Sequence, residues 1–263
     1  MQYVELLRAR NVIVRYAIVV LAIATAAAIA ALILPPHAVM VAGDKTDTSV
    51  HQGMVRLSLM GLWVGSALLA AIVATILGGS LASENRGHLE LAWTKPVSRL
   101  RYAASKMLVD AGAIFAVQVF TFAVLLALDL IHIRSAVNLV SHQADLVDAI
   151  RFALFPLAWY ALLQGLTASL REQAGIAQGL IWPIALGLTG VKQAPLGPVW
   201  TGIIGFVNLI NPFNYAHYTA NTGMGTFQVM GAEQAALLGV LGLATVIALG
   251  SFGALVQWKR LEA

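Results

Sequence analysis

Long runs without a charged side chain constrain this chain more than any other feature. Six such runs lie at about residues 16–35, 57–82, 107–131, 149–170, 174–191 and 233–257, with charges only near the ends of some of them. Each run is close to the roughly 20 apolar residues that cross a hydrocarbon core about 30 Å thick. Backbone polar groups must be paired in lipid, so each run is predicted to be a membrane-spanning α-helix.

The composition excludes a soluble globule. Apolar residues make up 59% of the 263 residues and charged residues only 11%, whereas a soluble domain carries about 25% charged residues. The absence of cysteine excludes disulfides, thiolate metal sites and a cysteine nucleophile. A clustered basic face of the kind that binds nucleic acid is also missing. We therefore expect an all-α, polytopic fold with six transmembrane helices in a single transmembrane domain, residues 1–263.

The N-terminal 15 residues read as an amphipathic helix lying in the membrane interface, with Glu5, Arg8 and Arg15 on its polar side. A charged lead-in that only sets the topology is the alternative. The apolar run that follows, Ala17 to Leu34, has 18 residues. This is longer than the 7–15-residue core of a secretory signal, so we expect a retained first span.

Residues 195–231 carry no charge but are poorly suited to crossing a membrane. Pro195, Pro198 and Pro212 interrupt the segment, and its apolar core, Val199 to Ile210, has only 12 residues. That length predicts a re-entrant or interfacial hairpin before the last span, on the outer side. An ordinary seventh span with an unusual sequence is the alternative.

Lysine and arginine placement predicts the orientation. With both termini inside, the cytoplasmic segments hold 11 of the 16 basic residues and the outer segments hold five. Because basic residues concentrate on the cytoplasmic side, this arrangement is favoured over its inverse.

The loop at residues 84–106 is the most informative polar segment. It holds five of the 16 basic residues and two of the 12 acidic ones. Pro96 forces a break, and Ser98 can cap a new helix that leads into the third span. A loop that only obeys the positive-inside rule would explain the Arg and Lys residues, but not Glu84, Gly87 or Glu90.

This loop resembles the membrane subunits of ABC-2 type transporters. Many of these carry, after the second span, a Glu, then Gly-x-Leu-Glu-Leu, then Pro-Val-Ser-Arg, with a Lys opening the third span. The corresponding residues here are Glu84, Gly87 to Leu91, Pro96 to Arg99, and Lys106. Outside the loop the likeness is one of architecture.

The resemblance implies a permease in the bacterial cytoplasmic membrane, paired with a second identical or homologous permease subunit and docked on a separate ATPase subunit. The region from Pro96 to Arg101 would contact the ATPase, and Glu84 and Arg99 are candidates for a charge pair. The implied ATPase-coupling residues are Glu84, Gly87, Glu90, Pro96, Ser98, Arg99 and Arg101. The family's translocation path implies Trp63, Ser66, Gln178 and Trp182 as candidate lining residues.

A nucleotide-binding partner is also expected from the residues themselves. The phosphate-binding pattern G-x-x-x-x-G-K-[ST] does not occur, and the nearest fragment, Gly43 to Thr46, lacks the required glycines. We therefore expect no catalytic residue and no metal site in this chain, with ATP and Mg²⁺ bound by the partner. All six histidines fall in loops or at span ends, which argues against an intramembrane enzyme.

Few polar residues lie inside the predicted spans, where they are functional candidates by default. Asp110 lies one turn from Lys106, and pairing between them is the alternative to a functional role. Gln164 and Gln178 are either interhelical hydrogen-bonding groups or pathway residues. Asp148 and Arg151, three residues apart, are predicted to pair at the start of the fourth span.

Small and aromatic residues suggest further packing. Two G-x-x-x-G pairs, Gly61 with Gly65 and Gly175 with Gly179, are candidate sites of close helix contact. The indoles of Trp159, Trp200 and Trp258 suit the aromatic belts at the membrane surfaces.

The leading function is the membrane half of an ATP-driven exporter for a hydrophobic or amphiphilic substrate. A secondary transporter is one alternative, although it would normally bury ionisable residues at mid-membrane. A non-transporting scaffold or immunity protein of the same fold is the other.

Overall fold

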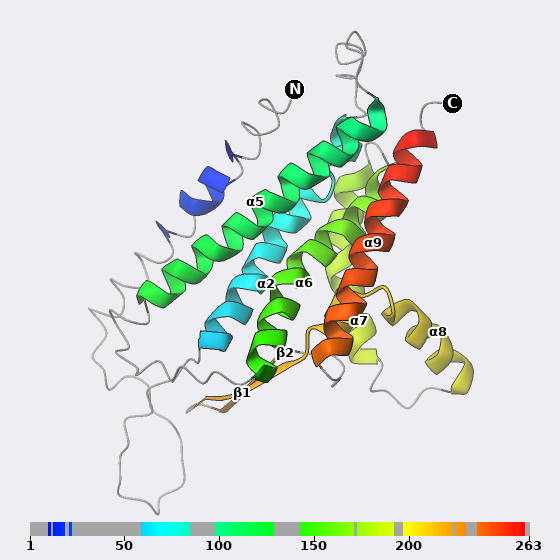
Figure 1. The fold of residues 1–263 in the computed structure, drawn as a ribbon. Helices are drawn as coiled ribbons and strands as arrows, with labels where there is room; N and C mark the ends of the chain where they lie inside the picture. Colours follow the sequence, from blue (N-terminus) through cyan, green and yellow to red (C-terminus); the bar gives the residue numbers. More distant parts are fainter. Residues whose placement is uncertain are drawn as a thin grey trace, which may run out of the picture.

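The computed structural model describes residues 10–11, 13–18, 21–22, 59–84, 98–128, 143–170, 173–191, 197–222, 225–229 and 236–260. The elements in these ranges are α2 (Leu59–Leu77), α3 (Ser80–Glu84), α5 (Arg99–Leu128), α6 (Gln143–Thr167), α7 (Ala174–Val191), α8 (Pro198–Asn208), the 3-10 helix η3 (Pro212–Tyr215), β1 (Tyr218–Thr222), β2 (Gly225–Val229) and α9 (Ala236–Arg260). Figure 1 shows these elements as a helical bundle.

Five helical segments are long and apolar enough to cross a membrane, by length and composition. They are Leu59–Ala82, Leu100–Leu128, Leu146–Thr167, Ala174–Val191 and Leu237–Arg260. These segments overlap five of the six predicted spans, so a multi-pass membrane protein is plausible. Most of the predicted first span, 16–35, lies outside the described residues. Near its start, the Tyr16 hydroxyl lies 3.0 Å from the Thr121 hydroxyl of α5.

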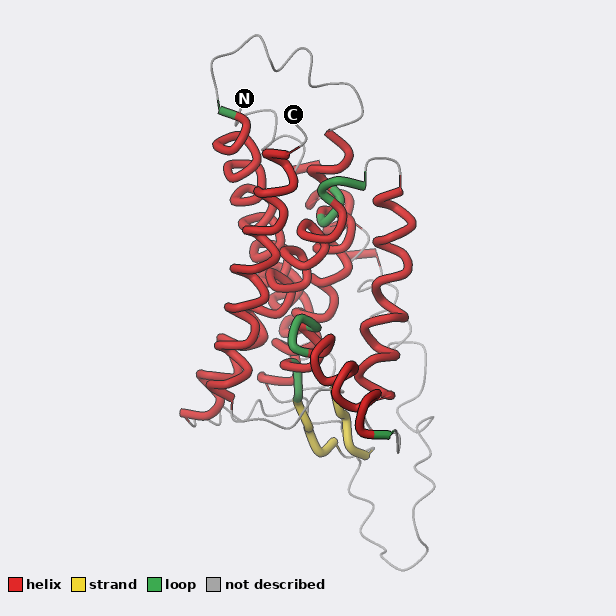
Figure 2. The backbone as a smooth tube through the Cα atoms, turned by 90° about the vertical axis from the view of Figure 1, so that its right-hand side faces the viewer, coloured by secondary structure: helices red, strands yellow, loops and turns green. Residues whose placement is uncertain are grey.

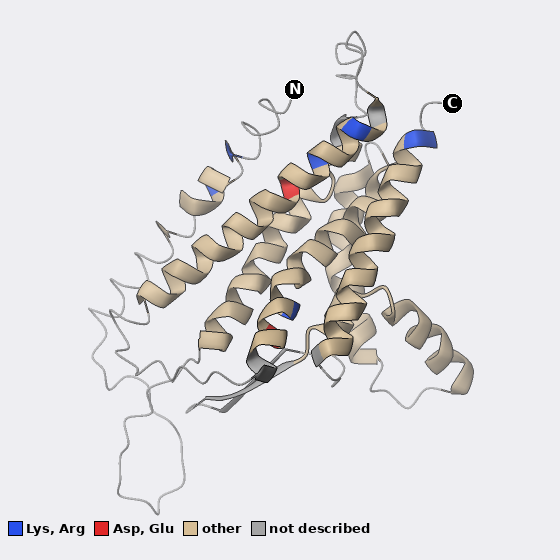
Figure 3. Ribbon diagram, in the orientation of Figure 1, with Lys and Arg blue, Asp and Glu red and all other residues tan. Residues whose placement is uncertain are grey.

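The bundle has two distinct ends. At one end, α5 begins and α9 finishes with Lys259 and Arg260. We call this the basic end, and Figure 3 shows blue basic residues gathered there. At the opposite end, the hairpin end, lie η3 and the two strands (Figure 2). At the basic end, the Arg101 amide donates to the Ser98 hydroxyl, 3.3 Å away. This confirms that Ser98 caps the helix of the third predicted span.

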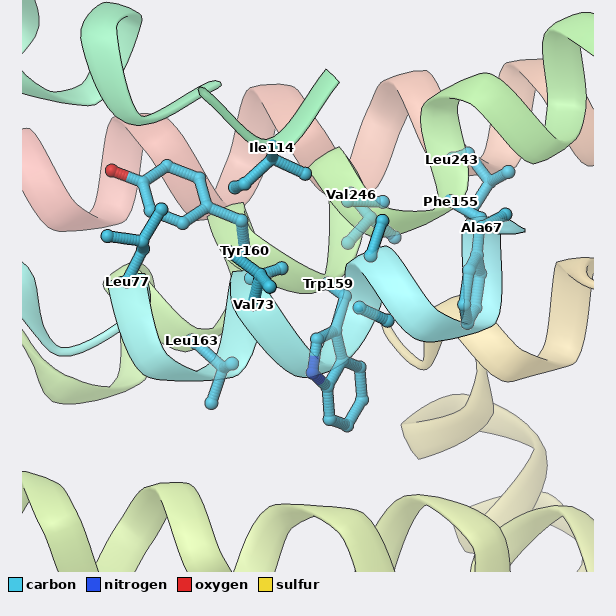
Figure 4. Packing of buried hydrophobic residues seen from close by; sticks show 14 of the residues in the cluster. Ala67, Val73, Leu77, Ile114, Phe155, Trp159, Tyr160, Leu163, Leu243 and Val246 are labelled. Atoms are coloured by element: carbon cyan, nitrogen blue, oxygen red, sulfur yellow. The ribbon is translucent and has the colours of Figure 1, made fainter. Parts of the chain in front are cut away.

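Helix α6 occupies the centre of the bundle and packs closely against α9. A β-carbon at Gly165 would lie 2.9 Å from the Gly250 carbonyl oxygen, and one at Gly250 would lie 2.6 Å from the Ala161 carbonyl carbon. The two backbones therefore touch where only glycine leaves room. The core around α6 includes Phe155, Trp159 and Leu163, which Figure 4 shows beside residues of α2 and α9.

Three of the four glycines in the predicted G-x-x-x-G pairs, Gly65, Gly175 and Gly179, make no close contact with another helix. A β-carbon at Gly175 or Gly179 would meet nothing within 4 Å, and one at Gly65 would only touch Leu125, at 3.8 Å. Gly175 and Gly179 lack close neighbours because α7 lies at the edge of the bundle. Its buried residues are Ala174, Ala185 and Thr189.

The aromatic-belt prediction is wrong for Trp159. Its side chain is fully buried between helices, and Trp258 is also buried, because both indoles face the bundle interior rather than the membrane surface. Trp200 on α8, in contrast, is exposed.

The segment before the last helix contains a short helix, as expected, and a β-hairpin that was not predicted. Helix α8 has 11 residues, about 16 Å at 1.5 Å per residue, too short to cross a membrane. Two asparagines hold it against α7: Asn208 donates to the Leu188 carbonyl at 3.2 Å and Asn211 to the Ala185 carbonyl at 2.9 Å. Strands β1 and β2 then pair in antiparallel fashion, so the all-α prediction misses this small sheet.

The predicted pair at the start of the fourth span is confirmed. An Asp148 carboxylate oxygen lies 2.9 Å from the Arg151 guanidinium. The buried Arg151 side chain also donates to the His217 carbonyl. It therefore ties the hairpin end of α6 to the residue just before β1.

Candidate functional site

The second predicted span is broken near its basic end. Helix α2 stops at Leu77, two glycines follow, and α3 starts at Ser80. Gly78 has no room for a side chain, since a β-carbon there would lie 2.6 Å from the Leu163 β-carbon, and one at Gly79 would meet the end of the Gln178 side chain, 2.9 Å from its amide carbon. The break is thus packed against α6 and α7.

Carbonyl groups near the end of α2 are paired with side chains of neighbouring helices. Gln178 donates to the Thr75 carbonyl at 2.8 Å, Gln164 to the Leu77 carbonyl at 3.1 Å, and Thr167 to the Gly78 carbonyl at 2.9 Å. In lipid a helix break is tolerated only where such partners exist. Both glutamines therefore act as interhelical hydrogen-bonding groups, one of the two roles predicted for them.

A buried polar cluster surrounds this break. Ser80 donates to the Asp110 carboxylate at 2.7 Å, and the Tyr160 hydroxyl donates to the same oxygen at 3.1 Å. The Gln164 amide nitrogen lies 2.7 Å from the Ser80 hydroxyl and 3.0 Å from the Tyr160 hydroxyl, so its two N–H groups are shared among these hydroxyls and the Leu77 carbonyl. We call these residues, Ser80, Asp110, Tyr160, Gln164 and Thr167, the polar joint. Each is at most 3% exposed.

Two ionisable side chains, one in the polar joint and one beside it, are buried, and burial makes an ionised group costly. Asp110 is 2% exposed, and Lys106, one helical turn earlier on α5, is 0% exposed. Their spacing places them on the same face of the helix. The Gln164 side-chain oxygen is also buried and has no hydrogen-bond partner. Among the described residues, however, no group of three His, Asp or Glu side chains could hold a metal ion.

Thr75 connects three helices beside the polar joint. Its hydroxyl accepts from the indole nitrogens of Trp159 on α6 and Trp182 on α7, both at 2.8 Å, and donates to the Ala71 carbonyl at 2.8 Å. The two indole rings lie 4.9 Å apart, and the ring of Phe213 is 5.3 and 5.5 Å from them. This aromatic contact attaches α7 to the bundle.

Replacing Thr75 with valine is expected to lower the free energy of unfolding by about 1–2 kcal/mol, because valine keeps the shape but leaves two indole N–H groups without an acceptor. Thermal unfolding followed by tryptophan fluorescence measures the change. Thr245→Val is the matched control, since the exposed Thr245 hydroxyl bonds only within α9. Equal effects of the two substitutions would contradict the role of Thr75.

The four predicted path residues lie on α2 and α7, near two different positions along α2. Trp63 donates to the Ala149 carbonyl of α6 at 2.9 Å, and the buried Ser66 bonds to the Trp63 carbonyl of its own helix. Gln178 and Trp182 both meet Thr75, twelve residues from Trp63. The structure therefore does not bring the four together.

Part of the predicted coupling loop can be located. Glu84 ends α3, Ser98 caps α5, Arg99 opens it and Arg101 is exposed in its first turn. Gly87, Glu90 and Pro96 lie outside the described residues, and the side chains of Glu84 and Arg99 are not described, so their predicted charge pair stays a prediction.

Thr75, Ser80, Tyr160 and Thr167 do not stand out as functional residues in the sequence alone. Two sequence signals point to these positions: the glycine pair before Ser80, and the four-residue spacing of Tyr160 and Gln164. Comparison with known proteins adds nothing to these contacts, because no protein-family model, no curated protein and no solved structure matches the chain.

Proposed function

We propose that the chain is the membrane subunit of an ATP-driven exporter, with its loop at residues 84–106 docked on a separate ATPase subunit. The observation that carries this proposal is the hydrogen bond between Ser80 and Asp110, 2.7 Å long. These residues stand on either side of the loop, so the loop begins and ends at one buried cluster. A segment anchored in this way can pass a push from a partner into the bundle.

Other features support the same proposal. The loop carries five basic and two acidic residues in a chain with only 28 charged residues, and its sequence resembles the corresponding loop of ABC-2 type permeases. In this proposal both termini are cytoplasmic, a second permease copy or homologue completes the complex, and the substrate is hydrophobic or amphiphilic.

Purification from its native membrane tests the proposal. We expect an ATPase subunit to co-purify with the chain in a fixed ratio, because the proposed loop contact holds the two together. Recovery of the chain alone, under conditions gentle enough to keep known membrane complexes together, would contradict it.

Arg99→Glu is expected to leave membrane insertion intact while reducing the stimulation of the partner's ATP hydrolysis at least tenfold, because it reverses the charge where α5 leaves the loop. The hydrolysis rate of the complex relative to the isolated ATPase measures this. Arg260→Glu, at the end of α9, is the control and should retain the stimulation. Unchanged stimulation in Arg99→Glu would refute the assignment of the loop.

A secondary transporter is the second candidate, favoured by the burial of Lys106 and Asp110 beside a broken helix. Such transporters place coupling ions where unwound carbonyls point into a cavity. Here three of the carbonyls at the break accept from Gln164, Thr167 and Gln178, which argues against a free ion site. Substrate uptake into liposomes driven by a proton or sodium gradient, without ATP, would favour this candidate.

A further inference from the structure

The polar joint connects the predicted coupling loop to one particular helix. Tyr160, Gln164 and Thr167 lie at positions i, i+4 and i+7 of α6, which places them along one face of that helix. From this face they contact Ser80 at the start of α3, Asp110 on α5 and two carbonyls at the end of α2. Helix α6 therefore holds both sides of the loop.

Helix α6 is in turn fixed to α9. Gly165 and Gly250 bring the two backbones into contact, and Gln257 donates to the Gly165 carbonyl. Backbone atoms in such a contact cannot shift independently of their helices. Consequently α6 and α9 form one closely packed pair, and the polar joint lies on the face of α6 that contacts α3 and α5.

The connection between α3 and α2 is different in kind. It is covalent and runs through Gly78 and Gly79, which are packed against α6 and α7. Bonds from α3 to α5 and α6 are buried hydrogen bonds. A displacement of the loop can thus be passed on through Ser80 to α5 and α6 as well as along the chain into α2.

We propose that Tyr160 and Ser80 are positioning residues that transmit movement of the loop at residues 84–106 to α6, so that α6 and α9 move as one unit during transport. This inference rests on the proposed function for its mechanical input. The joint itself and its effect on helix arrangement can be tested without that function.

Two conservative variants remove single oxygen atoms from the joint. Tyr160→Phe removes the hydroxyl shared between Asp110 and Gln164, and Ser80→Ala removes the hydroxyl that joins the two sides of the loop. Tyr215→Phe is the matched control, because it removes a phenol hydroxyl that donates to the Leu209 carbonyl at 2.7 Å, at the hairpin end.

The first readout is functional. In nanodiscs of phosphatidylethanolamine and phosphatidylglycerol, we expect both joint variants to retain the ATPase subunit but to lower the stimulation of its hydrolysis at least fivefold, with Tyr215→Phe within twofold of the unmodified protein. A purely structural loss would reduce the amount of bound ATPase subunit as well. Stimulation within twofold in both joint variants would overturn the proposal.

The second readout needs no partner. The chain has no cysteine, so spin labels can be placed on Leu108→Cys of α5 and Phe252→Cys of α9, whose side chains are 76% and 68% exposed. We expect a single narrow distance distribution in the unmodified background and in Tyr215→Phe, and a broadened one in Tyr160→Phe and Ser80→Ala. Unchanged distributions in both joint variants would overturn the proposal even if stimulation fell.

The two readouts separate failure of this inference from failure of the proposed function. If no ATPase subunit co-purifies, the exporter proposal fails and the spin-label distances alone decide whether the joint positions α5 relative to α9. If an ATPase subunit is present and the distances broaden while stimulation is unchanged, the joint is only structural and the proposed transmission is refuted.

Discussion

Asp110→Ala is expected to lower the free energy of unfolding by about 3–5 kcal/mol, the range typical for removing one partner from a buried charged group. The substitution leaves the Ser80 and Tyr160 hydroxyls without their acceptor. It also leaves the fully buried Lys106 without the carboxylate one turn away. Since folded proteins are stable by only about 5–15 kcal/mol, the yield of monodisperse protein in mild detergent should fall sharply.

Two further variants show which part of this loss comes from charge. Asp110→Asn keeps an acceptor oxygen of similar shape and should have a smaller effect than alanine. The double variant Lys106→Met with Asp110→Leu removes both buried charges together and should recover part of the stability lost in Asp110→Ala. A double variant less stable than Asp110→Ala would show that the two charges do not compensate each other.

Gly250→Ala is expected to destabilise the protein by about 3 kcal/mol, the upper end of the usual range for overpacking a core. The new methyl group would lie 2.6 Å from the Ala161 carbonyl carbon. Because this neighbour is backbone rather than a flexible side chain, α6 and α9 would have to move apart. Thermal unfolding and size-exclusion chromatography in detergent measure the result.

Gly253→Ala provides the control on the same helix. A β-carbon at this position would lie 4.0 Å from the α-carbon of Gly165, an ordinary contact, and alanine has the higher helix propensity. We therefore expect Gly253→Ala to be neutral or slightly stabilising. Similar losses in both variants would mean that the close α6–α9 contact does not form.

The helices could be predicted from sequence because apolar runs and caps are local signals. Helix α7, Ala174–Val191, coincides with a run between charged residues, and the Ser98 cap follows from its place two residues after Pro96. The Asp148–Arg151 pair could also be predicted, since residues three apart on a helix are neighbours. Each of these depends on a short stretch of chain.

The polar joint could only be predicted in part, because it depends on how helices are placed in space. The sequence identified Asp110 and Gln164 as unusual in a membrane, but Ser80 and Tyr160 become significant only when α3 and α6 lie side by side. Glycine spacing is likewise insufficient: Gly175 and Gly179, one of the two predicted pairs, make no close contact, whereas the close contact between α6 and α9 uses Gly165 and Gly250, which are 85 residues apart. The predicted place of Trp159 in an aromatic belt is wrong because its burial also depends on how the helices are placed. Its indole N–H donates to Thr75 on another helix.

The close contact between α6 and α9 has a consequence for how the protein is made. Positions 161 and 250 are 89 residues apart, so a ribosome adding about 5–20 residues per second needs about 4–18 s to synthesise the chain between them. The partners of α6 in the polar joint, α2, α3 and α5, are all translated before it. We therefore expect these helices to assemble first during insertion, leaving the glycine face of α6 open to lipid until the last helix arrives and docks on it.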